Sequence, residues 1–165
     1  MSVDLDFFNS LPSGEAAEAL LPCCGSRAWA RRMAESRPFR DLAELREKSD
    51  AIWRSLGGED WREAFATHPR IGEKGSRWSE QEQAGARDAN AETLAELIAA
   101  NREYEARFGH IFIVCATGKT AAEMLGLLRH RLDNDREIEL YIAAEEQRKI
   151  INLRLEKLLL KGANS

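Results

Sequence analysis

The sequence has little cysteine, little proline and no apolar run long enough to cross a membrane. Its 165 residues include three cysteines, and two of these, Cys23 and Cys24, are adjacent. Such a set does not form the paired framework of a disulfide-stapled secreted protein. The N-terminus has no basic segment followed by an apolar core, and no Ser-Lys-Leu address ends the chain. We therefore expect a reduced, cytoplasmic protein without membrane association or peroxisomal import.

Basic residues are not in excess either. The chain has 24 Lys and Arg against 28 Asp and Glu, a formal net charge of −4 and a pI near 5.5. Nucleic acids and anionic membranes bind basic faces, so we expect neither as the main partner. A small polar substrate suits this charge balance better.

Metal-ligand and phosphate-binding motifs are also missing. The three histidines and three cysteines form no His-x-x-x-His or Cys-x-x-Cys pair. The Gly-Lys-Thr run at 118–120 resembles the end of a phosphate-binding loop, but Ile113 stands where that motif needs glycine. The sequence therefore predicts no P-loop and no metal site.

What the sequence does have is helical periodicity along most of its length. Apolar residues recur at helical spacing in segments separated by Pro, Gly or Asp-Asn runs. The predicted helices lie at about 13–21, 26–33, 41–56, 60–67, 91–108, 120–132 and 135–160, and residues 6–11 are expected to form a short turn or helix. We predict an all-α fold, an irregular single-domain bundle of about seven or eight helices over residues 1–165.

Several details of these helices are specific predictions. Ser13 and Ser26 are expected to cap their helices, and Thr120 with Glu123 has the spacing of a capping box. Gly109 is a plausible left-handed residue after the helix that ends at Phe108. The inner stripe of the last helix is expected to contain Ile138, Tyr141, Ile142, Glu145, Ile150, Leu153 and Leu158.

One short apolar segment, His110 to Cys115, has the composition of a strand in an otherwise helical chain. No other stretch offers a strand of comparable strength as a partner. Its backbone N–H and C=O groups therefore lack a ladder, and buried ones must bond elsewhere. A ligand ring with several donors and acceptors would satisfy them.

His68 is the best candidate for an acid or base. It follows an amphipathic helix and precedes Pro69, which disfavours helical geometry, so the imidazole should sit at a helix C-terminus and not on a packed face. Helix carbonyls favour the protonated ring and burial opposes it, so its charge is tunable near neutral pH. A plain turn residue is the alternative.

Glu82 is the candidate partner of His68. With Ser79 it also has capping-box spacing, so a purely structural role is the alternative. The preceding segment, Gly72 to Trp78, is rich in glycine and charge and reads as a surface loop that could act as a lid.

Four motifs in series identify the chain as similar to a known family. They are His-Pro-Arg-Ile-Gly-Glu-Lys at 68–74, Trp-Ser-x-x-Glu-Gln-Ala-Gly at 78–85, Phe-Gly-His-Ile-Phe-Ile at 108–113 and Lys-Ile-Ile-Asn-Leu-Arg-Leu at 149–155. Together they resemble 2-oxo-4-hydroxy-4-carboxy-5-ureidoimidazoline (OHCU) decarboxylase. The resemblance covers most of the chain in order, with no large insertion.

The resemblance implies an activity and an assembly. The family decarboxylates OHCU to S-allantoin and CO2, the last step of urate conversion to allantoin in purine catabolism. It implies a carboxy-lyase without cofactor or metal, and a homodimer.

The resemblance also implies roles for particular residues. His68 and Glu82 would be catalytic. Arg154, which otherwise reads as an arginine snorkelling beside an apolar stripe or paired with a helix carboxylate, would bind substrate. The other implied substrate-binding residues are Thr67, Pro69, Gln83, Phe108, Ile111, Ile113 and Val114, with main-chain atoms used in the extended segment.

Two readings from other classes remain open. A metal hydrolase would use His68, His110, His130 and Cys115. A helical adaptor would bind a partner through an exposed stripe, take no ligand and be indifferent to changes at His68.

Overall fold

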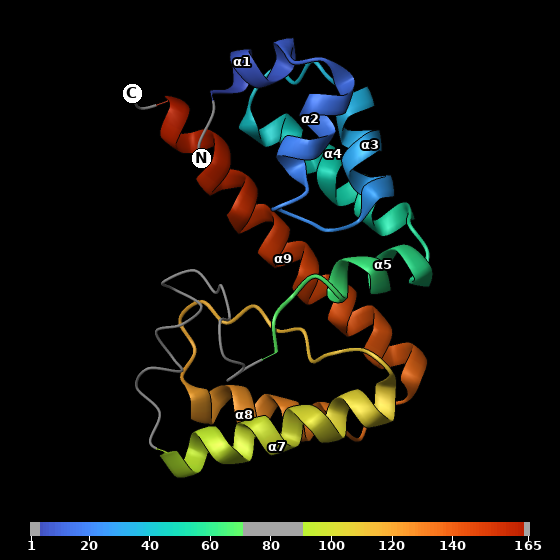
Figure 1. The fold of residues 1–165 in the computed structure, drawn as a ribbon, viewed down its shortest axis with the longest axis vertical. Coiled ribbons are helices and arrows are strands. Elements are labelled where there is room, and N and C mark those ends of the chain that lie inside the picture. The colour runs from blue at the N-terminus through green and yellow to red at the C-terminus, as the bar shows by residue number, and fades with distance from the viewer. Residues whose placement is uncertain (1–3, 71–90, 164–165) are drawn as a thin grey trace. The chain divides into compact units, whose positions relative to one another are not determined.

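In the computed structural model, residues 4–70 and 91–163 are described, with side chains up to residue 159. These residues form eight helices and no strand (Figure 1). The helices are α1 (Leu5–Ser10), α2 (Ser13–Leu20), α3 (Arg27–Glu35), α4 (Leu42–Ser55), α5 (Gly58–Phe65), α7 (Ala91–Phe108), α8 (Ala121–Arg131) and α9 (Arg136–Ala163). The predicted all-α class is confirmed.

The chain divides into two compact units. The first comprises residues 1–64 and 148–165, and the second comprises residues 65–147. Helix α9 contributes its N-terminal half to the second unit and its C-terminal half to the first. The single domain expected from the sequence stays a prediction.

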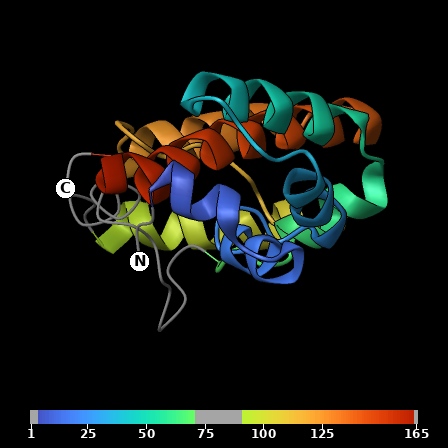
Figure 2. The same ribbon diagram turned by 90° about the horizontal axis from the view of Figure 1, so that it is seen from above.

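In the first unit, α3 packs against both α2 and α4. Helix α4 lies along the C-terminal half of α9, as the view in Figure 2 shows. Arg46 of α4 pairs with Glu156 at 3.1 Å, and Asp50 accepts a hydrogen bond from Asn152 Nδ2 at 3.1 Å. Arg148 lies 3.5 Å from the same carboxylate. These polar contacts fix where the C-terminal half of α9 meets α4.

Most of the predicted helix ends are confirmed. Ser26 caps α3 by accepting from Trp29 N, and Thr120 with Glu123 forms a complete capping box on α8. The predicted Ser13 cap is wrong. Pro12 occupies the cap position of α2 without a side-chain bond, because its fixed φ already sets up the first turn and makes Ser13 the first helical residue. Helix α5 also begins at Gly58, slightly before the predicted start.

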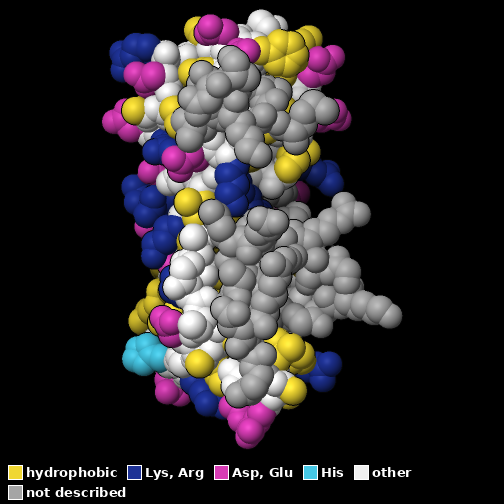
Figure 3. All heavy atoms as spheres, turned by 90° about the vertical axis from the view of Figure 1, so that its left-hand side faces the viewer, with side chains coloured by type: hydrophobic (Ala, Val, Ile, Leu, Met, Phe, Trp, Pro, Cys, Tyr) yellow, Lys and Arg dark blue, Asp and Glu magenta, His cyan; other side chains and the backbone are white. Residues whose placement is uncertain are grey.

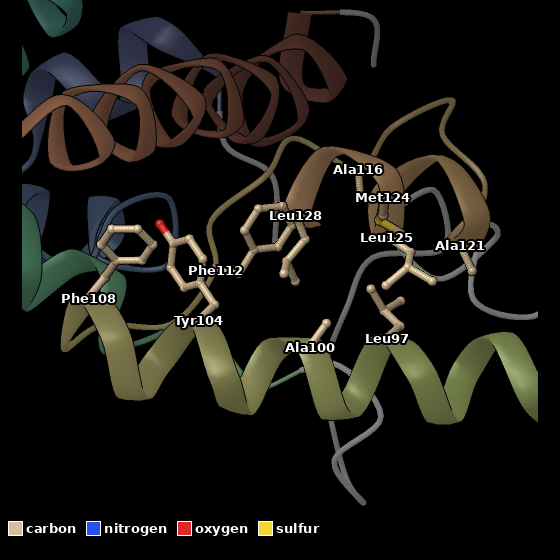
Figure 4. Close-up of a cluster of buried hydrophobic side chains, with 10 residues drawn as sticks. All are labelled: Leu97, Ala100, Tyr104, Phe108, Phe112, Ala116, Ala121, Met124, Leu125 and Leu128. Carbon is tan, nitrogen blue, oxygen red and sulfur yellow. The ribbon is translucent and has the colours of Figure 1, made fainter. Parts of the chain in front are cut away.

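The second unit is built on the packing of α7 against α8. Figure 4 shows the cluster between them, which the extended segment completes. Its buried residues are Leu97, Ala100, Tyr104, Phe108, Phe112, Ala116, Ala121, Met124, Leu125 and Leu128. Gly109 ends α7 with φ of +80° and donates to Glu105 O at 2.9 Å, which is the predicted left-handed cap. The turn sends the chain back across the cluster.

The predicted inner stripe of α9 is wrong in its first turns. Ile138 and Tyr141 are 50% and 64% exposed, whereas Glu139 and Gln147 are completely buried. Periodicity alone placed the apolar side chains inside, but buried polar side chains are stable when they find partners. Both of these polar residues have partners, described below.

The face of the molecule in Figure 3 carries Lys and Arg side chains interspersed with Asp and Glu. Where described residues form that face, no continuous basic stripe of the kind that binds nucleic acid is visible. None of the described helices is both long and apolar enough to cross a membrane.

Candidate functional site in the second unit

His68 lies three residues after the end of α5, where the sequence placed it. Its backbone N–H donates to Phe65 O at 3.1 Å, which closes a turn before Pro69. The side chain is half-buried. The histidine is therefore held at a chain turn and presents a ring that is neither packed away nor fully solvated.

The imidazole is held by a glutamine of α9. His68 Nε2 lies 2.6 Å from Gln147 Oε1, and Gln147 is completely buried. The roles of the two atoms depend on the tautomer of the ring, and because a carbonyl oxygen only accepts, they form a hydrogen bond when Nε2 carries the proton. The contact therefore orients the ring.

The extended segment is held by side chains instead of a strand ladder. Cys115 N–H donates to Glu146 Oε1 at 3.0 Å, and Arg131 Nη1 donates to Ile113 O at 2.7 Å. Lys119 Nζ donates to Cys115 O at 2.8 Å. The predicted lack of a ladder is confirmed for the described residues, and charged side chains replace part of it.

Some backbone donors of the extended segment find no acceptor within the described part of the chain. Among the residues that the structure describes, none accepts a hydrogen bond from the N–H groups of Ile111, Ile113 or Val114. Ile113 is buried, and the other two are half-buried. Unpaired amides at such depth are rare and need an explanation such as a ligand or water.

A buried ion pair between Arg131 and Glu139 anchors the extended segment, because Arg131 also donates to Ile113 O. Arg131 Nε donates to Glu139 Oε1 at 2.6 Å, and both side chains are almost fully excluded from solvent. Tyr104 Oη donates to the same carboxylate oxygen at 2.5 Å, and Asn134 Nδ2 donates to Oε2 at 3.0 Å. Burial, together with the bond to Glu139, raises the pKa of Tyr104 well above its usual range. The phenol therefore stays a donor at any physiological pH.

Aromatic rings cover this ion pair. The Arg131 guanidinium lies 4.5 Å from the centre of the Phe112 ring. The His110 ring centre lies 5.1 Å from that of Phe65 and 5.6 Å from that of Tyr104. The Phe108 ring packs on Tyr104 at 4.6 Å. The Phe108 side chain is thus part of the buried cluster of the second unit.

The predicted site residues fall into three groups. Thr67, His68, Pro69, Phe108, Ile111, Ile113 and Val114 all lie in the second unit. Arg154 lies on α9 in the first unit, where it is half-buried and its charge acts on the thiols of Cys23 and Cys24. Glu82, Gln83 and the proposed lid at 72–78 lie outside the described residues.

Sequence reasoning missed four polar residues that build the site: Arg131, Glu139, Glu146 and Gln147. The signal that could have found them is a run of charged and amide residues between apolar ones in α9, at 145–147, and an arginine inside the apolar face of α8. Within the described residues, no three His, Cys, Asp or Glu side chains converge as ligands for a metal ion.

The cysteines are poorly suited to nucleophilic chemistry. Burial raises the pKa of Cys23 and that of Cys24 to about 12, although the nearby Arg154 charge lowers both. Cys115 is also buried. The thiolate is the reactive form, so the native thiols of Cys23 and Cys24 should be inert.

This inertness is testable by alkylation. A pKa rise from 9.0 to about 12 lowers the thiolate fraction at pH 8 by about 10³-fold. We expect iodoacetamide to label Cys23 and Cys24 in the native protein far more slowly than in urea, as followed by peptide mass spectrometry. Equal labelling rates in the two states would contradict the buried placement.

Comparison with known proteins bears on what this site does. The family model described as OHCU decarboxylase matches residues 9–156. The uric acid degradation bifunctional protein TTL of Arabidopsis thaliana is 41% identical over 145 residues, covering 82% of this chain and 45% of that protein. The uric acid degradation bifunctional protein PucL of Bacillus subtilis is 29% identical over 160 residues, covering 94% and 32%. The chain thus spans less than half the length of these relatives.

A solved structure is similar over nearly its whole length. It is the crystal structure of an OHCU decarboxylase in the presence of (S)-allantoin, with 40% sequence identity and a TM-score of 0.77. The match covers 85% of this chain and 96% of that chain.

Proposed function

Because the chain belongs to the OHCU decarboxylase family, we propose that it converts OHCU to S-allantoin and CO2, the last step of urate degradation to allantoin. The observation that carries this proposal is the family match over residues 9–156, which includes His68 and the whole extended segment. The similar structure with (S)-allantoin supports the same substrate class.

Decarboxylation leaves one electron pair behind, and this pair must be delocalised. The bond between the ring carbon and the carboxylate breaks, CO2 leaves, and the electron pair passes into the conjugated C–N system of the ring. One proton then completes allantoin. Enzymes often use a cofactor for such a sink, but this substrate supplies its own. We therefore propose a carboxy-lyase that requires no cofactor and no metal ion.

The roles follow from the chemistry of the side chains. His68 accepts the hydroxyl proton of the substrate or directs the loss of its carboxylate. Glu82 orients His68 or transfers the proton that returns to the product. Thr67, Pro69 and Gln83 shape the pocket. The planar guanidinium of Arg154 suits a carboxylate or a ureido carbonyl.

The extended segment supplies main-chain groups for the ureido and ring atoms, through Phe108, Ile111, Ile113 and Val114. The amides of Ile111, Ile113 and Val114 that find no acceptor in the described structure support this role.

We also propose a cytoplasmic homodimer.

The direct test is optical. The uncatalysed decay of OHCU gives racemic allantoin, because a free planar intermediate takes its proton on either face. With wild-type protein and freshly generated OHCU, we expect a growing circular-dichroism signal of S-allantoin at a rate above spontaneous decay. A racemic product at the spontaneous rate would overturn the proposal and favour the adaptor alternative.

A further inference from the structure

Gln147 is an unexpected residue for the buried face of α9. It is completely buried, and so are its helix neighbours Ala143 and Ala144, at 0% and 3% exposure. A buried amide costs about 1–3 kcal/mol for each polar group left unpaired. An apolar side chain of similar length would avoid that cost.

The amide of Gln147 is only half satisfied. Its Oε1 lies 2.6 Å from His68 Nε2, whereas its Nε2 has no hydrogen-bond partner among the residues that the structure describes. Stability alone therefore does not explain a glutamine here. The partner of its single bond is the candidate acid or base of the site, which indicates a role in holding that ring.

We propose that Gln147 is a positioning residue that fixes His68 in the tautomer with its proton on Nε2. The proposal rests on the proposed decarboxylase function, since it gives His68 its purpose. Neutral imidazole has one donor and one acceptor nitrogen. An acceptor oxygen at Nε2 places the proton there, so Nδ1 is the ring nitrogen without a proton in the neutral form.

A neutral partner suits a group that changes charge. In the imidazolium form both ring nitrogens carry protons, so the bond from Nε2 to Gln147 Oε1 persists. The ring thus keeps one orientation in both states. A carboxylate at this position would instead favour the imidazolium over the neutral ring. The glutamine sets orientation without adding a charge.

Two variants separate positioning from structure. Gln147→Met keeps the length of the side chain and removes both the acceptor and the unpaired donor. Gln147→Glu restores an acceptor oxygen and lacks the donor. We expect the Met variant to melt at or above the wild-type temperature, because it removes a buried unpaired N–H. The same variant should lose about 10–100-fold in kcat, as when a partner that orients a functional histidine is removed.

The tautomer is read directly from nitrogen chemical shifts of the histidine rings. We expect wild-type His68 to show protonated Nε2 and unprotonated Nδ1, and the Met variant to show a mixture. The Glu variant should recover the Nε2 proton and show more of the imidazolium, in which Nδ1 is protonated too. His130 is exposed on α8 and serves as the internal reference, with the same shifts in all three proteins.

Each result decides the inference. A protonated Nδ1 in the wild type overturns it, and so does a Met variant that loses stability and kcat while the tautomer is unchanged. Full activity of the Met variant with a lost tautomer overturns it too, and leaves the decarboxylase function standing. If the wild-type protein has no OHCU activity, the proposed function is refuted. The hydrogen bond between His68 Nε2 and Gln147 is then purely structural, and the positioning role falls with the function.

Discussion

Replacing His68 by asparagine is expected to return both the rate of OHCU decay and the handedness of its product to those of the uncatalysed reaction. The loss of a positioned acid or base costs about 10²–10⁴-fold in rate. Asparagine keeps a polar side chain in the turn after α5 but cannot exchange a proton near neutral pH. The measurement is the circular-dichroism time course, with total OHCU consumption followed in parallel.

The matched control is His130→Asn. His130 is exposed on α8, and this change should leave rate and handedness as in the wild type. Both variants should melt close to the wild-type temperature, since neither histidine is deeply buried. Full production of S-allantoin by the folded His68 variant would show that the imidazole is a turn residue and not a catalyst.

Glu139→Gln is expected to destabilise the protein more than any surface change. It removes the charge that balances Arg131, whose side chain is 7% exposed, while keeping the size of the residue. An unbalanced buried charge of this kind costs about 3–5 kcal/mol. For a protein of this size that corresponds to a fall in melting temperature on the order of 10 °C. Urea unfolding and calorimetry both measure it.

The control is Glu96→Gln, which breaks the exposed pair with Arg129 at 3.2 Å. Exposed pairs contribute about 0–1 kcal/mol, so this variant should be nearly neutral. Replacing Arg131 and Glu139 together by Met and Leu should recover much of the stability, because no charge is then left alone. Equal effects of Glu139→Gln and Glu96→Gln would mean that water reaches Arg131.

The helical fold could be predicted because its signals are local. The C-terminal end of α7 follows from the glycine at 109, and α8 begins at a capping box formed within four residues. Ser13 shows the limit of such rules, since a proline immediately before it took the cap position.

The candidate site could be predicted only in part because its polar contacts are distant in sequence. His68 stands out beside Pro69, but its partner Gln147 is 79 residues away. Periodicity assigned Ile138 and Tyr141 to the inside of α9, and the buried carboxylate of Glu139 took that side instead. Its three donors come from α7, α8 and the turn before α9, and no local pattern announces such a convergence.

Two adjacent residues of α9 contact the two parts of the candidate site. Glu146 binds the extended segment, and Gln147 contacts His68. Glu139 lies two helical turns earlier on the same helix and carries the ion pair. An α-helix turns by about 100° per residue, so one inserted or deleted residue between Glu139 and Glu146 would rotate one anchor away from the others. Insertions and deletions should therefore be tolerated better in the turn before α9 than between Glu139 and Glu146.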